Sequence, residues 1–193
     1  MTYVELIVVL TIFASLSTVV IFSHSEFQSK IDIKNLATDI AFKIIEAQKS
    51  ATNGRMNTRA AGDDNWKPSY GIYIKPNDIS FVYFLDYQPR NSQYDDSSSL
   101  GCPNTGECLD RPLLTKGNTI SNLDVFYQGD PTPQNLNLTD LTISFVRPNA
   151  VAILKSTPQL NENIVDYVQI EVKSPKDNKA YIKVYASGKI EIN

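Results

Sequence analysis

The hydrophobic and polar positions divide the chain into two regions. From Leu6 to Phe22 the residues are apolar except for small hydroxyl side chains, and Glu5 is the only charged side chain in the first 23 residues. This stretch approaches the roughly 20 apolar residues that cross a bilayer as a helix. It lacks the basic start and the small-residue cleavage site of a secretory signal peptide, which is the alternative interpretation. We therefore expect a retained apolar helix.

The helical pattern continues beyond this stretch and ends at Asn53-Gly54, a typical helix stop. Apolar residues recur at spacings of three and four, which predicts a stripe that packs on a globular head: Ile33, Leu36, Ala37, Ile40, Ala41, Ile44, Ala47 and Ala51. A second, patchier strip is expected to meet neighbouring subunits, or alternatively to widen the surface that faces the core: Phe27, Ile31, Phe42 and Ile45. A helix over residues 2–52 would be about 75 Å long, more than a domain of this size buries.

After Gly54 the apolar pattern changes to a period of two, which is typical of strands. We expect strands at 70–74, 79–85, 141–147, 151–155, 165–173, 180–186 and 189–192. The polar range 86–119 is predicted to be a long exposed loop, and turn residues between consecutive strands favour antiparallel hairpins. The predicted fold is α+β, with a long helix over 1–53 (apolar over 1–23, amphipathic over 24–53) on an antiparallel sheet head over 54–193.

Composition and charge narrow the class of protein. The 193 residues are 42% hydrophobic and 20% charged, which is enough for a packed core. The net charge of -3 argues against a protein whose main task is to coat nucleic acid. Cys102 and Cys108 are the only cysteines, and Pro103 and Gly106 between them permit the tight turn of a short disulfide loop. A zinc site is not expected, because the other ligands are missing.

Glu5 stands out because a carboxylate in an apolar membrane segment costs roughly 2–3 kcal/mol and usually has a partner. If Met1 is the mature N-terminus, its α-amino group is a cation one helical turn away. The pairing could form within one helix or between staggered subunits. The alternative is that Glu5 reaches the headgroup boundary of the membrane.

The sequence offers no basis for catalysis, a cofactor or a metal. It contains one histidine, His24, and no nucleophile elbow, phosphate-binding glycine loop or metal-ligand cluster. The pairs Asp63-Asp64 and Asp95-Asp96 lack the alternating spacing of a calcium loop and are interpreted as solvated carboxylates. Asn137-Leu138-Thr139 has the form of an N-glycosylation acceptor. We therefore expect a protein that is not an enzyme.

The first ten residues, MTYVELIVVL, resemble the mature N-terminus of type IV pilins and pseudopilins, with Thr at the second position and Glu at the fifth. The resemblance implies that a prepilin peptidase removed a basic leader and N-methylated Met1. Three positions depart from the usual pattern, since family members often carry Phe, Gly and Pro where this chain has Met1, Ala14 and Phe22.

The resemblance implies a pilin fold and a structural subunit of a type IV pilus-like extracellular filament, in which Glu5 neutralises the N-terminal amine of a neighbouring subunit. The implied partners are copies of the chain, other pilins, the prepilin peptidase and the assembly machinery, with a single-pass location in the cytoplasmic membrane before assembly. The tail from Leu141 resembles the H-type pseudopilin and minor-pilin group. This leaves a type II secretion pseudopilin, or a tip subunit that binds DNA or a surface ligand, as alternatives. A small basic cluster bears on DNA: Lys173, Lys176, Lys179 and Lys183.

Overall fold

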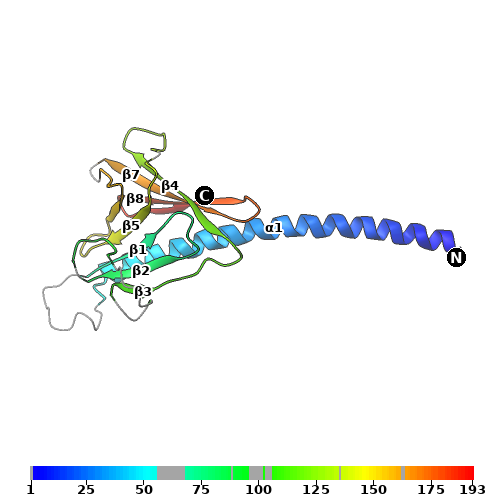
Figure 1. Ribbon diagram of the computed structural model, residues 1–193, viewed down its shortest axis with the longest axis horizontal. Helices are drawn as coiled ribbons and strands as arrows, with labels where there is room; N and C mark the ends of the chain where they lie inside the picture. The colour runs from blue at the N-terminus through cyan, green and yellow to red at the C-terminus, as the bar shows by residue number, and fades with distance from the viewer. Residues whose placement is uncertain are drawn as a thin grey trace.

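The computed structural model of the protein describes residues 2–55, 68–87, 89–95, 102, 106–134, 136–161 and 164–193, apart from the side chains at 20–23 and 25. Its one helix within these ranges is α1 (Tyr3–Thr52). The C-terminal half of α1 lies in the head and the N-terminal half extends away from it (Figure 1). Asn53 caps the end, and Gly54 follows with a φ of +62°, a conformation that glycine adopts without strain.

The strands form two antiparallel sheets. The first has the order β3-β2-β1-β5-β6 and consists of β1 (Ser69–Ile74), β2 (Phe81–Asp86), β3 (Cys108–Asp110), β5 (Asp140–Phe145) and β6 (Ala152–Thr157). The second has the order β4-β7-β8-β9 and consists of β4 (Thr119–Tyr127), β7 (Val165–Lys173), β8 (Lys179–Tyr185) and β9 (Ile190–Ile192). The predicted α+β class with antiparallel strands is confirmed.

The helix was expected to pack on one face of the sheet head, whereas α1 contacts both sheets. Its neighbours are β1 and β5 of the first sheet and β7, β8 and β9 of the second. A wide apolar stripe on the helix makes this possible, since its residues are at most 2% exposed: Ile33, Ala37, Ile40, Ala41, Ile44, Ala47 and Ala51. Leu36 is partly buried beside them.

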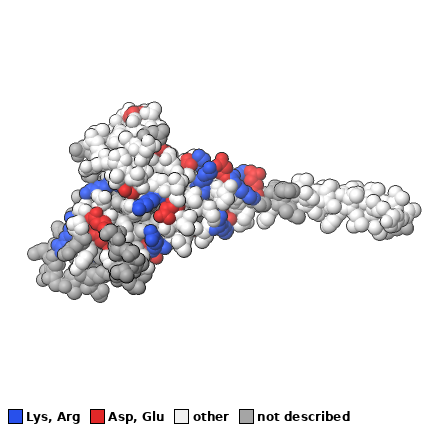
Figure 2. All heavy atoms as spheres, viewed as in Figure 1, with Lys and Arg blue, Asp and Glu red and all other residues white. Residues whose placement is uncertain are grey.

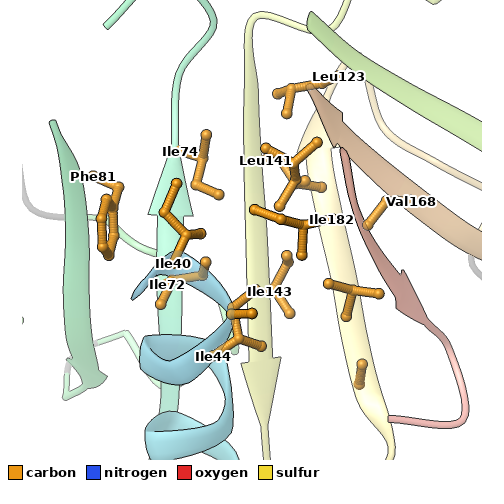
Figure 3. Close-up of a cluster of buried hydrophobic side chains, with 14 of the residues drawn as sticks. Ile40, Ile44, Ile72, Ile74, Phe81, Leu123, Leu141, Ile143, Val168 and Ile182 are labelled. Carbon is orange, nitrogen blue, oxygen red and sulfur yellow. The ribbon is translucent and has the colours of Figure 1, made fainter. Parts of the chain in front are cut away.

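The core lies where the helix meets the two sheets. Figure 3 shows Ile40 and Ile44 of α1 beside Ile72 of β1 and Ile143 of β5, and Ile182 of β8 belongs to the same cluster. Each of these isoleucines is fully buried. Burial of one such side chain stabilises the fold by about 1.5–3 kcal/mol. The core therefore fixes the position of the helix relative to both sheets.

The range 86–119, expected to be an exposed loop, contains both exposed and packed residues where the structure describes it. It contains strand β3, which pairs with β2, and Leu114 is 7% exposed. The structure also contains the disulfide between Cys102 and Cys108 that the sequence predicts. Cys108 joins a small second core with Val82 and Phe84 on the outer side of the first sheet. The sequence did not predict β3 because this strand is only three residues long and has no alternating pattern of its own.

Two buried carboxylates fasten the loop that follows β2. Asp86 is 4% exposed and accepts hydrogen bonds from Ser69 Oγ at 2.9 Å and from the Ser92 N–H at 2.8 Å. Glu107 is 3% exposed, and its two carboxylate oxygens accept the backbone N–H of Tyr87 at 3.0 Å and of Asp95 at 2.9 Å. The Glu107 carboxylate thus holds Tyr87, just after β2, close to Asp95.

Replacing Thr142 by valine should raise the free energy of unfolding by about 1 kcal/mol. Thr142 is fully buried in β5, and among the described residues its hydroxyl is the only buried side-chain oxygen or nitrogen without a hydrogen-bond partner. Valine has nearly the same shape and removes this desolvation cost. Urea unfolding of the full chain measures the change.

Ser144→Ala is the matched control, because Ser144 is equally buried two residues along the same strand. Its hydroxyl donates to the Ser92 carbonyl at 2.8 Å, so we expect the alanine variant to lose about 1 kcal/mol. A loss of stability in Thr142→Val would show that its hydroxyl does have a partner.

Candidate assembly surface

The N-terminal half of α1 presents an apolar surface that nothing in the described chain covers. Between Tyr3 and Val19 the large hydrophobic side chains are exposed, from 42% at Ile7 to 80% at Tyr3. We call the part of α1 over residues 3–19 the rod. In Figure 2 the rod is white over most of its length, whereas charged residues gather where the helix enters the head. Monomeric soluble proteins rarely expose apolar patches larger than a few hundred Å². The rod is therefore the strongest candidate for an interface.

The hydroxyl side chains of the rod do not interrupt its apolar surface. Thr11 and Ser15 donate to carbonyls three residues earlier, each at 2.8 Å. Ser17 and Thr18 donate to carbonyls four residues earlier, at 2.8 and 2.9 Å. Each hydroxyl thus satisfies its donor within the helix, which lets the surrounding surface behave as apolar.

Glu5 and Thr2 form a capping box at the start of α1. The Thr2 hydroxyl accepts the Glu5 N–H at 3.3 Å, and the Glu5 carboxylate accepts the Thr2 N–H at 3.3 Å. Sequence reasoning missed this role, although Thr2 followed three residues later by Glu5 is the pattern of such a box. Met1, the predicted methylation site and partner of Glu5, lies outside the described residues. The predicted pairing of Met1 with Glu5 remains a prediction.

The predicted second strip lies on the helix face opposite the core. At about 100° per residue, Phe27, Ile31, Phe42 and Ile45 fall within an arc of about 60°. Phe27 and Phe42 are 61% and 63% exposed, Ile31 is 37% exposed and Ile45 is partly exposed. Leu6, Val9 and Phe13 of the rod fall on the same arc, and Leu16 lies about 20° beyond its edge. These residues form an interrupted apolar stripe on one side of α1, which also carries His24 and Thr38.

A hollow lies beside this stripe, between α1 and the segment that follows β3. It has a volume of about 370 Å³, and its apolar lining comes from Leu36 and Phe42 of the helix and from Phe81, Leu113 and Leu114. Leu113 is 68% exposed at its rim. Phe42 also lines a second hollow of about 510 Å³ further along the helix. The head thus has recesses next to an exposed aromatic side chain.

Polar contacts determine where the head begins on the helix. The turn between β7 and β8 reaches Ser29, whose hydroxyl accepts from Asn178 Nδ2 at 3.0 Å. Lys116 forms an ion pair with Asp32 at 2.7 Å, and Lys43 pairs with Asp110 of β3 at 3.3 Å. The head is therefore fastened to the helix from Ser29 onward, and the rod lies before this point.

The basic cluster that raised the DNA-binding alternative is largely paired. Lys173 forms an ion pair with Asp177, and Lys179 pairs with Glu171 at 3.0 Å. The bond to Glu171 raises the pKa of Lys179. Lys183 lies 5.0 Å from the centre of the Tyr167 ring, a cation–π contact. These contacts leave little unpaired positive charge for phosphate, so the arrangement does not favour DNA as a ligand.

Other predicted features are only partly within the structure. Asp63-Asp64 and Asp96 lie outside the described residues, and His24 is exposed. In the ranges given above, no three His, Cys, Asp or Glu side chains are placed to share a metal ion. Within the same ranges, no helix is both long enough and apolar enough to span a membrane.

The chain matches no known protein family, no curated protein and no solved structure. Its function must therefore be inferred from its own residues.

Proposed function

We propose that the protein is the structural subunit of a type IV pilus-like extracellular filament, with a pilin fold in which a long N-terminal helix carries an antiparallel β head. The observation that carries this proposal is the exposure of the rod over residues 3–19. Apolar surface of that extent is unfavourable in water, and the rods of other copies offer the matching cover. A bundle with the rods inside and the heads outside would bury the apolar rods and keep the heads in contact with water.

Glu5 has a second role in this proposal. In a bundle of apolar rods a lone carboxylate is costly, by roughly 2–3 kcal/mol, so it needs a cation. The N-terminal amine of Met1 in a neighbouring copy would supply it and would fix the stagger between subunits. The sequence also predicts that the same apolar surface holds the subunit in the cytoplasmic membrane before assembly.

The test compares Glu5→Gln with Thr2→Ala in filaments sheared from cells that produce the full chain. The glutamine variant keeps an oxygen that can accept the Thr2 N–H but loses the charge, whereas Thr2→Ala keeps the charge and loses the hydroxyl that accepts the Glu5 N–H. We expect Glu5→Gln to lower incorporation by at least about tenfold, because removal of one partner leaves an unpaired buried amine. Thr2→Ala should change incorporation by less than about threefold, the cost of a weakened exposed cap.

Mass spectrometry of the same filaments reads out identity and abundance. Wild-type chain as the dominant species, beginning with N-methyl-Met1, supports the proposal. Absence of the chain from any filament contradicts it. Equal incorporation of Glu5→Gln and wild type would contradict the pairing role of Glu5 but not the filament.

A further inference from the structure

We propose that the 370 Å³ hollow between α1 and residues 112–115 is a socket for apolar side chains from the rod of a second copy of this chain. The proposal rests on the filament proposed above and adds to it a site on the head. The hollow is open, with Phe42 and Leu113 exposed at its edge, while Phe81 and Leu114 are buried in its lining.

The charges around the hollow favour an uncharged occupant. Asp39, Lys43 and Glu46 line it together with the apolar residues. Lys43 is already paired with Glu46 at 3.1 Å and with Asp110 at 3.3 Å, so it does not need an external anion. Residues 6–19 carry no charged side chain at all. An uncharged apolar helix would cover Phe42 and Leu113 and would bring no charge of its own against the Lys43–Glu46 pair.

The occupant must come from another copy. Phe13, the only aromatic residue in 6–19, is separated from Phe42 by 29 residues of one continuous helix. At about 1.5 Å per residue this is about 44 Å. The rod of a chain therefore cannot reach the hollow of the same chain.

The geometry also explains why such contacts would not stop at a dimer. The rod and the hollow are different surfaces at different heights of the same helix, so a contact between them is heterologous. Each copy that inserts its rod still offers its own hollow, and a heterologous contact that does not close on itself generates a helical filament. The exposed Phe27 and Phe42 lie on the same interrupted stripe of α1 as the rod residues Leu6, Val9 and Phe13.

Leu113→Asp tests the socket. The side chain is 68% exposed, so the substitution should change the free energy of unfolding of the full chain by no more than about 0.5 kcal/mol. In sheared filaments we expect at least about a tenfold loss of incorporation, because a charge would be buried against the incoming rod. Val151→Asp is the control, because Val151 is 51% exposed and does not line the hollow.

Photo-crosslinking identifies the occupant. Filaments that carry p-benzoylphenylalanine in place of Leu113 should give a crosslink to a peptide from residues 6–19, which must belong to another copy. A crosslink only to head residues or to a different protein overturns the socket, as does full incorporation of Leu113→Asp. In those cases wild-type filaments still support the proposed function, whereas absence of the chain from filaments overturns both.

Discussion

Replacing Gly188 by alanine should lower the free energy of unfolding by about 3 kcal/mol or more. Gly188 lies in the turn between β8 and β9 with a φ of +88°. A Cβ there would overlap the backbone carbonyl oxygen of Ala150 and lie 2.8 Å from Gln48 Nε2. The Gln48 amide donates to the carbonyls of Ala150 and Gly188, each at 2.9 Å. The substitution would therefore separate the helix and the two turns that meet at this point.

Gly129→Ala separates the cost of the positive φ from the cost of the overlap with the Ala150 carbonyl. Gly129 has a similar φ of +81°, but a Cβ at that position meets no atom within 4 Å. The control should lose only about 1 kcal/mol, the cost of a positive φ for a residue with a Cβ. Urea unfolding of the three full-length chains gives both numbers. Equal losses in the two variants would show that the Ala150 carbonyl moves aside at little cost.

The elements of the fold that sequence predicts are those whose burial follows one regular period. Ile33, Ile40 and Ile44 recur at helical spacing and are buried on one face. The alternation in β7 and β8 is equally regular, and their buried residues pair across the two strands, as Val168 with Val184 and Ile170 with Ile182. In these elements local periodicity and tertiary packing agree.

The elements that sequence does not predict depend on distant contacts. In β4 the alternation of Ile120, Leu123 and Val125 is interrupted by irregular pairing with β7 near Ile120 and Phe126. Strand β3 exists through pairing with β2. The hollow depends on Leu113 lying beside Phe42, 71 positions earlier in the chain. No local sequence pattern indicates that Leu113 and Phe42 lie close together. The rod could therefore be proposed from the sequence, and the socket could not.

The stability of the protein should fall by about 2–3 kcal/mol as the pH rises from about 4.5 to about 7 through the titration of Glu107. The pKa of this carboxyl is raised from 4.5 to about 7, chiefly by burial and also by the carboxylates of Asp86 and Asp95, against the two backbone N–H donors that favour the charged form. The folded chain thus holds a proton that the unfolded chain releases over this range. Unfolding becomes easier as the pH rises, and the effect is complete above about 7.

Glu107→Gln isolates the titration, because the glutamine amide does not titrate, although its NH2 group cannot accept a hydrogen bond and so leaves one of the two backbone N–H groups, of Tyr87 or Asp95, unpaired. At pH 4.5 the variant should therefore be less stable than the wild type in urea unfolding, by about 1–3 kcal/mol. Between pH 4.5 and pH 8 the difference should shift by about 2–3 kcal/mol in favour of the variant, since it does not bury a negative charge beside Asp86 and Asp95. Titration of the other carboxyl groups is common to both chains and cancels in the difference. A difference that stays constant between pH 4.5 and 8 would mean that Glu107 titrates normally, so that its two backbone N–H donors offset the whole cost of burial.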